Sequence, residues 1–247
     1  MWEEPCVSGS RGSGAIFFSG CALRCSYCQN AAISRRADGE EYDAAGLAEL
    51  MCGLEDGGAH NINLITAAHF LPSVADALAI FKRKSRLPVV YNTSAYEKAE
   101  ELRRLDGLVD VYLPDLKYYD GALADRYSKA ADYNAVATAA IDEMVRQQPR
   151  TVTDGGLIKK GVIVRHLLLP SHASDSARVL EQIAERWGGC VLLSLMRQFT
   201  PEFAPEELRR RVTSYEYGSL VRLAEKLGLD GYVQDGDSAC GKYTPVF

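Results

Sequence analysis

The fold of this chain is decided by a strand-like run, Ala15-Ile16-Phe17-Phe18, and by the loop that follows it, Gly20-Cys21-Ala22-Leu23-Arg24-Cys25-Ser26-Tyr27-Cys28-Gln29-Asn30. The four apolar residues are typical of a buried strand. The three cysteines have a C-x3-C-x2-C spacing, and they can converge on one point if the chain loops around it. Grouped thiolates bind soft metals, iron–sulfur clusters above all. The stretch therefore predicts a strand that leads into a metal-binding loop.

Three thiolates leave one iron of a four-iron cluster without a protein ligand, and that iron is then free to react. The alternatives are a zinc site or three unrelated thiols. A structural zinc site takes four protein ligands, usually from two C-x2-C-type pairs. The other cysteines form no second pair and the histidines form no zinc-finger spacing, so the iron–sulfur interpretation is favoured. The residues concerned are Cys6, Cys52, Cys190, Cys240, His60, His69, His166 and His172.

Length and composition bound the remaining possibilities. A chain of 247 residues suits one large α/β domain better than two ordinary ones. Apolar residues make up 47% and charged residues 25%, so a buried core is expected and disorder is not. The net charge of −5 argues against broad nucleic-acid binding, which relies on a basic surface.

The sequence carries no signal for secretion or for a membrane. Residues 1–6 show no basic region followed by an apolar core, so we do not expect a signal peptide. No apolar run approaches the length that spans a bilayer. Seven cysteines, three of them clustered, do not form the pattern of a disulfide scaffold, and cluster thiolates need reducing conditions. We expect a cytoplasmic protein with neither a membrane nor a nucleic acid as partner.

The chain alternates strand-length apolar runs with amphipathic segments of helical period. Strands are expected at residues 15–18, 61–66, 88–92, 109–115, 162–169 and 190–196, with a short one at 232–234. Helices are expected at residues 43–55, 72–84, 96–105, 122–130, 134–148, 174–187 and 213–227. Glycine-rich and polar residues predict a flexible turn at 7–14, a polar loop at 151–161 and an irregular segment at 199–211.

About six strand–loop–helix units in succession require a mostly parallel sheet with right-handed crossovers. Six units fall short of the eight that close a full barrel, so we predict a partial (β/α)6 barrel of the α/β class. The barrel is expected to occupy residues 14–234, with a lead-in at 1–13 and a tail at 235–247 in one domain. Reactive groups in such folds lie at the carboxyl ends of strands, which is where the cysteines are placed.

Polar side chains follow several of the other predicted strands. Thr66 and Asn92 end two of them, and Asp115 and Lys117 end a third, two residues apart and so on one face. A buried arginine inside an apolar strand needs an anionic partner, and for Arg165 this is either Asp115 or the carboxylate of a ligand.

Each of these residues also has a structural interpretation. Asp115 and Lys117 can equally form a plain surface ion pair at a strand exit. Arg165 and His166 are neighbours in one strand and cannot both face the barrel interior, so one of them is structural. His69 lies in a loop and is a weak candidate for the site.

The cysteine motif, with an aromatic residue before its last cysteine, resembles the signature of the radical S-adenosylmethionine (radical SAM) enzymes. Further segments resemble one branch of that superfamily, the pyruvate formate-lyase activating enzyme-like proteins of the PflX type. They run in order along residues 4–200 and are 4–9, 12–14, 28–30, 61–66, 91–94, 112–118 and 165–167. The cysteine motif alone identifies only the superfamily, and the ordered series of segments indicates the branch.

The resemblance implies a partial (β/α)6 barrel with a [4Fe–4S] cluster held by Cys21, Cys25 and Cys28, which makes these cysteines both the metal ligands and the catalytic centre. It also implies that the fourth iron binds the amino and carboxylate groups of S-adenosylmethionine (SAM). The backbone of Tyr27, the residue before the last cysteine, would contact the adenine of SAM.

The remaining cofactor contacts are implied in the same way. The second strand of the family usually ends in a Gly-Gly-Glu-like stretch that receives the SAM amino group, but here it reads Ile65-Thr66-Ala67-Ala68, and Thr66 is the candidate. By the same resemblance, Arg165 would bind the SAM carboxylate. Asn92, Asp115 and Lys117 would lie near the methionyl end of SAM.

The expected activity is reductive cleavage of SAM to a 5′-deoxyadenosyl radical, which removes a hydrogen atom from a substrate. An electron donor of the flavodoxin or ferredoxin type would reduce the cluster. The resemblance to activases suggests a glycine of a partner protein as the substrate, and a peptide or small molecule is the alternative. A non-catalytic iron–sulfur or zinc protein is the alternative of another class. Members of the branch usually carry an N-terminal extension, so we expect either that the protein is a short form or that its extension lies outside this sequence.

Overall fold

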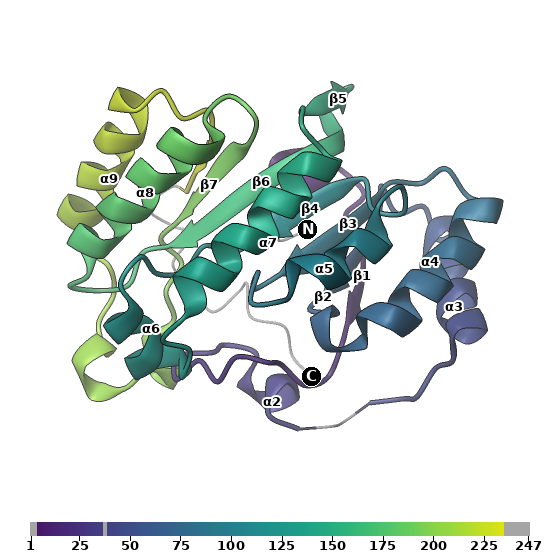
Figure 1. Ribbon diagram of the computed structural model, residues 1–247, viewed down its shortest axis with the longest axis horizontal. Coiled ribbons are helices and arrows are strands. Elements are labelled where there is room, and N and C mark those ends of the chain that lie inside the picture. The colour runs from purple at the N-terminus through teal and green to yellow at the C-terminus, as the bar shows by residue number, and fades with distance from the viewer. Residues whose placement is uncertain (1–3, 37–38, 235–247) are drawn as a thin grey trace.

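The structure is a computed structural model that describes residues 4–36 and 39–234, and it is a curved, mostly parallel sheet with helices along its outer face (Figure 1). Seven strands pair in the order β1-β2-β3-β4-β6-β7-β8, each parallel to its neighbour, and β5 pairs antiparallel with β6. The strands are β1 (Gly14–Phe17), β2 (Ile62–Ile65), β3 (Val89–Thr93), β4 (Val111–Pro114), β5 (Val152–Asp154), β6 (Leu157–Leu167), β7 (Leu192–Met196) and β8 (Gly231–Val233). This is the partial barrel that the strand–helix alternation predicts.

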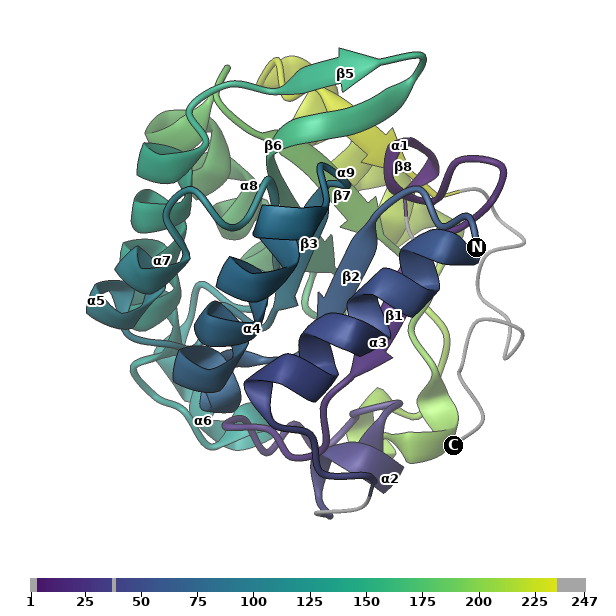
Figure 2. The ribbon, with the colours of Figure 1, turned by 90° about the vertical axis from the view of Figure 1, so that its right-hand side faces the viewer.

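The longer helices connect successive strands and cover the outside of the sheet (Figure 2). The α-helices are α1 (Pro5–Ser8), α2 (Ala31–Ser34), α3 (Ala44–Asp56), α4 (Leu71–Lys84), α5 (Ala99–Leu102), α6 (Gly121–Ser128), α7 (Tyr133–Gln147), α8 (Ala173–Trp187) and α9 (Ser214–Lys226). Short 3-10 helices are η1 (Ala68–Phe70), η2 (Arg103–Leu105), η3 (Pro201–Phe203) and η4 (Glu206–Leu208). Among the described residues, no helix is both long enough and apolar enough to cross a membrane.

Alternation along each strand separates an outer core from an inner one. Tyr91 and Tyr112 face the helices, where their rings meet edge to face at a centroid distance of 6.0 Å. Val90 and Val111, one residue earlier in each strand, belong to the inner core. Because β3 and β4 are buried on both faces, each of them begins with consecutive apolar residues instead of an alternating pattern.

The amino end of the barrel is closed by α1. Cys6 and Val7 of this helix pack with Val90, Val111 and Ile163 on the inside of the sheet. The carboxyl ends of the strands lie at the opposite end, where α2 follows the cysteine loop (Figure 2). The amino end of the barrel is therefore closed by a small apolar cluster to which α1 contributes.

The prediction of a polar loop at residues 151–161 was wrong. The structure forms a hairpin there, in which β5 pairs with the first residues of an eleven-residue β6. Gly155 and Gly156 form its turn with φ angles of 57° and 79°, a conformation that glycine adopts without strain. All three residues of β5 are exposed, so burial leaves no apolar pattern in the sequence.

Two further segments differ from the prediction. Residues 7–14 contain the end of α1 instead of only a flexible turn. The helix expected at 96–105 is reduced to α5 and η2, because the backbone after β3 first makes a tight turn at Ala95, whose φ is 58°. The tail expected at 235–247 lies outside the described residues.

Candidate active site

Four polar side chains meet inside the barrel at the carboxyl ends of β3, β4 and β6. We call Asn92, Asp115, Lys117 and Arg165 the strand-end cluster. The Asp115 carboxylate accepts hydrogen bonds from Arg165 Nε at 2.9 Å and from Lys117 Nζ at 2.6 Å. Arg165 also donates to Asn92 Oδ1 at 2.7 Å. The charged side chains are only 14 to 18% exposed, so this is not a plain surface pair.

The strand-end cluster carries two positive charges and one negative charge. Burial would raise the pKa of Asp115, but the charges of Arg165 and Lys117 outweigh it and lower the pKa below its ordinary value. For Lys117, burial opposes the charged form, yet the charge of Asp115 produces a net rise in pKa. All three groups are thus ionised at neutral pH, and the surplus positive charge suits an anionic ligand.

Arg165 faces the barrel interior and His166 faces the helices. His166 Nδ1 donates to the carbonyl of Leu116 at 2.7 Å, and its Nε2 accepts from the Ser176 hydroxyl of α8 at 2.8 Å. Burial lowers the pKa of His166 to about 4, so the ring is neutral. His166 is therefore a structural residue, and Arg165 is the member of the pair that borders the site.

The cysteine loop, residues 20–30, lies against the carboxyl end of α6. The backbone N–H of Ser26 donates to the carbonyl of Tyr127 at 2.7 Å, and that of Arg24 donates to Ser128 at 3.3 Å. The last carbonyls of a helix have no partner within the helix, and the loop satisfies two of them here. The loop that carries the cysteines is thereby fixed to the segment that follows β4.

The three thiols are half-buried and free. Burial raises the pKa of Cys21 and Cys25, and the positive charge of Lys117 partly counteracts it at both. The thiols also affect one another electrostatically, which places them in one neighbourhood together with Lys117. The structure thus brings the cysteine loop and the strand-end cluster to the same end of the barrel.

Within residues 4–36 and 39–234, no three side chains of cysteine, histidine, aspartate or glutamate gather closely enough to hold a single metal ion. A four-iron cluster makes a different demand, because each cysteine binds a separate iron and the sulfur atoms stay apart. Three soft sulfur donors on one loop match that donor chemistry.

Two residues that the sequence analysis did not single out contact the cysteine loop. Tyr118, which follows the Asp-x-Lys segment, bonds to the Tyr27 hydroxyl at 2.6 Å, and Ser128 donates to Cys25 Sγ at 3.0 Å. Burial raises the pKa of both tyrosines, so they keep their hydrogens. Only the position of Tyr118 beside Lys117 hinted at its role, and nothing in the sequence marked Ser128.

The remaining candidates are more peripheral. Thr66 directly follows β2, one residue after Ile65, which pairs in register with Asn92. This places Thr66 at the rim of the site, half-buried. His69 Nε2 bonds to the backbone carbonyl of Ser19 at 2.6 Å, so it braces the entry of the cysteine loop. Cys6 belongs to the opposite end of the barrel.

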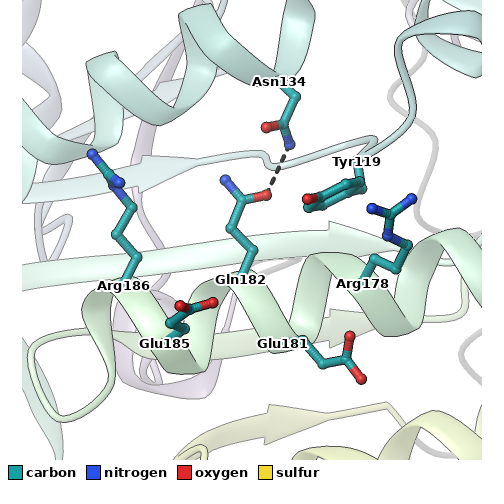
Figure 3. Close-up of a pocket in the computed structure, with 7 residues that line it drawn as sticks. All are labelled: Tyr119, Asn134, Arg178, Glu181, Gln182, Glu185 and Arg186. Atoms are coloured by element: carbon teal, nitrogen blue, oxygen red, sulfur yellow. Dashed lines mark hydrogen bonds between the residues drawn. The ribbon is translucent and has the colours of Figure 1, made fainter.

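A surface hollow between α7 and α8 is bordered by side chains of the two helices and by Tyr119, from the segment after β4 (Figure 3). Asn134 Nδ2 donates to Gln182 Oε1 at 2.9 Å across it, and the Arg178 guanidinium stacks 3.8 Å from the centre of the Tyr119 ring. Arg186 of the same hollow pairs with Asp142, and no cysteine lines it among the described residues.

Comparisons with known proteins identify the family of this chain. The family described as the radical SAM superfamily matches residues 15–166. An uncharacterised protein of Methanocaldococcus jannaschii is 28% identical over 232 residues, which cover 88% of this chain and 63% of that protein. This chain therefore spans less than two thirds of the length of that relative.

Two solved structures have the same fold at low sequence identity. SuiB of Streptococcus suis bound to its precursor peptide SuiA has a TM-score of 0.60 and 11% identity, over 91% of this chain and 49% of SuiB. A domain of a pyruvate-formate lyase-activating enzyme from Bacteroides vulgatus has a TM-score of 0.55 and 10% identity, over 72% of this chain and all of that domain. Since the family match covers more than half of the sequence, this chain belongs to the radical SAM superfamily, whose enzymes use a [4Fe–4S] cluster and S-adenosylmethionine.

Proposed function

We propose that this chain cleaves SAM reductively to a 5′-deoxyadenosyl radical, which removes a hydrogen atom from a substrate. Cys21, Cys25 and Cys28 are the proposed cluster ligands. The observation that carries the proposal is the meeting of two features at one end of the barrel. Three soft thiols lie on one loop, and a buried cluster with surplus positive charge lies beside it. A bound [4Fe–4S] cluster would supply the electron that cleaves SAM into methionine and a 5′-deoxyadenosyl radical.

The strand-end cluster is our proposed site for the methionyl part of SAM. A carboxylate that approaches Arg165 and Lys117 meets two cations already held in place by Asp115, so little side-chain ordering is left to be done. Asn92 contributes an amide beside Arg165. Thr66 at the rim is proposed to receive the SAM amino group, and the Tyr27 backbone to contact adenine.

The substrate we propose is a glycine of a partner protein, as in the activating enzymes that the sequence segments resemble. The fold likeness to a domain of a pyruvate-formate lyase-activating enzyme is consistent with this choice. A peptide substrate is the second candidate, because SuiB, which has the same fold, is seen bound to a precursor peptide. A small molecule is the third. We also propose that residues 1–247 form a single radical SAM core domain.

The electron donor we propose is an acidic protein of the flavodoxin or ferredoxin type. The chain is acidic overall, yet Arg24, Arg35 and Arg36, on and just after the cysteine loop, are exposed. Charges of opposite sign on two surfaces steer their encounter, and salt weakens the attraction. Cluster reduction by such a donor should therefore slow as ionic strength rises.

The deciding experiment is anaerobic reconstitution of the chain with iron and sulfide, followed by reduction with dithionite in the presence of SAM. The wild-type chain should bind four irons and release 5′-deoxyadenosine and methionine. Cys25→Ala should release neither, whereas Cys52→Ala, which removes a half-buried cysteine outside the loop, should behave as the wild type. An intact four-iron cluster that yields no 5′-deoxyadenosine would overturn the proposal.

The substrate class can be tested with the same preparation. A partner protein with deuterated glycine should transfer deuterium into 5′-deoxyadenosine if a glycine hydrogen is removed. Transfer from a deuterated peptide instead would replace the glycyl-radical proposal with peptide modification. The comparison needs only mass spectrometry of the released nucleoside.

A further inference from the structure

A line of buried hydroxyl groups leads from the core to the sulfur of Cys25. The hydroxyls of Tyr27 and Tyr118 are 2.6 Å apart, and those of Tyr118 and Ser128 are 2.7 Å apart. Ser128 Oγ lies 3.0 Å from Cys25 Sγ. All three side chains are almost fully buried, so solvent water cannot replace a missing link in the line.

The direction of these hydrogen bonds follows from the chemistry of the last acceptor. A thiolate that ligates iron carries no hydrogen, so Ser128 must donate to Cys25. Each hydroxyl has a single hydrogen, so Tyr118 then donates to Ser128 and Tyr27 donates to Tyr118. Bonds aligned in one direction polarise one another and strengthen the last of them.

The fold holds this line rigidly. Ser128 is the last residue of α6, and its carbonyl accepts the backbone N–H of Arg24 from the cysteine loop. The rings of Tyr118 and Tyr133 pack edge to face, at a centroid distance of 5.5 Å. The backbone hydrogen bond between Ser128 and the cysteine loop therefore holds the Ser128 hydroxyl close to Cys25.

The three cysteines are not equivalent in this respect. Cys28 Sγ lies 3.6 Å from the hydroxyl of Ser34, which has no other side-chain hydroxyl bonded behind it in the described structure. For Cys21 the hydrogen-bonding group is the backbone at Leu23. Cys25 alone of the three is bonded to the end of an aligned hydroxyl series, as far as the described residues show.

We propose that Ser128, supported by Tyr118 and then Tyr27, is a positioning residue that raises the one-electron reduction potential of the cluster through Cys25. Reduction adds one negative charge to the cluster and its sulfur ligands, and a hydrogen bond to a ligand sulfur stabilises that charge. The inference rests on the proposed ligation of the cluster by Cys25. It assigns to the β4–α6 segment a second task, besides supplying Asp115 and Lys117 to the strand-end cluster.

The test is a potentiometric titration of the reconstituted chain, followed by electron paramagnetic resonance of the reduced cluster. Ser128→Ala should lower the midpoint potential most, because it removes the bond to sulfur. Tyr118→Phe should lower it less, because Ser128 remains but loses its donor, and Tyr27→Phe should lower it least. The matched control is Ser34→Ala, which removes a serine hydroxyl facing another cysteine at a longer distance and should shift the potential less than Ser128→Ala.

Iron and sulfide content are measured for every variant, so that potentials are compared only between complete clusters. A Ser128→Ala variant with a complete cluster and an unchanged potential overturns the inference, whether or not SAM is cleaved. If Ser128→Ala holds no cluster, the two tyrosine variants decide, and unchanged potentials in both overturn it. A wild-type chain that assembles no cluster instead refutes the proposed function on which the inference rests.

Discussion

Two neighbouring residues of β6 face opposite sides of the sheet, and one of them is charged while the other is neutral. Arg165 points into the barrel and is charged, with the carboxylate of Asp115 and the amide of Asn92 as its partners. His166 points at α8 and is neutral, with a backbone carbonyl and a hydroxyl as its partners. Both sites satisfy the polar groups they bury, but only the inner one keeps charge.

The difference shows where this barrel accepts the cost of burying charge. A buried ion pair contributes little net stability, because desolvation offsets the attraction between the charges. A neutral group with two hydrogen bonds would have been sufficient for the fold, as His166 demonstrates on the other face. The charges of the strand-end cluster are therefore better explained by a ligand than by stability, which is consistent with the proposed SAM site.

The largest expected effect comes from removing the carboxylate of Asp115, the anion of the strand-end cluster. Asp115→Asn leaves Arg165 and Lys117 without a counter-charge, and losing one partner of a buried pair costs about 3 kcal/mol of unfolding free energy. Urea unfolding of the apoprotein measures it. Glu207→Gln, which breaks the exposed pair with Arg126, is the control and should change little. Equal effects in the two variants would show that the inner charges are effectively solvated.

The next largest effect is the loss of stability at acid pH that arises from His166, on the outer face of β6. Burial holds the pKa of His166 near 4, below the value of about 6.5 that it has when unfolded, so the unfolded chain takes up a proton first. The contribution of this residue is thus complete above pH 6.5 and is lost as the pH falls towards 4, by an amount on the order of 3 kcal/mol. Urea unfolding of wild type and His166→Asn across this range measures the difference, which removes the contributions of the other acids. A difference independent of pH would contradict the assignment.

The sequence predicted the buried strand β6, but it did not predict which of its side chains face the barrel interior. The run 162–169 is apolar enough to predict a doubly buried strand, and alternation requires that Arg165 and His166 diverge. It does not say which of them faces inward, because that depends on the register with β4 and β7. Asp115 could be identified as one of two partners for Arg165, since parallel strands end at the same edge.

What the sequence could not predict depends on contacts between distant segments. Ser128 meets Cys25 only because α6 folds back onto the cysteine loop, 103 residues away in sequence, and a lone serine at a helix end gives no signal. The β5–β6 hairpin was missed because its exposed residues have no apolar pattern. The cysteine loop itself was predictable because its ligands are local and their spacing alone encodes the chemistry.

The third prediction returns to the inner site and its ligand. Arg165→Gln should weaken SAM binding to the reconstituted protein by roughly tenfold to a hundredfold, the loss expected for a hydrogen bond to a charged group. Arg165→Lys should lose less, because it keeps the charge but not the planar fork. Equilibrium dialysis measures both, with His166→Asn as the outward-facing control. An affinity unchanged in Arg165→Gln would make Arg165 only the structural partner of Asp115.

The smallest expected effect is the loss of unfolding free energy when the neutral hydrogen bond between Ser176 and His166 is removed. Ser176→Ala removes the hydroxyl that donates to His166 Nε2 and leaves that nitrogen buried without its partner. Since no charge is involved, the loss should be about 1 kcal/mol of unfolding free energy at pH 8, well below that of Asp115→Asn. The SAM affinity should not change, because the bond lies on the face of β6 that the helices cover. Should Ser176→Ala instead cost as much as Asp115→Asn, the contrast between the charged and neutral faces of β6 would not hold, and the inner charges would need no ligand to explain them.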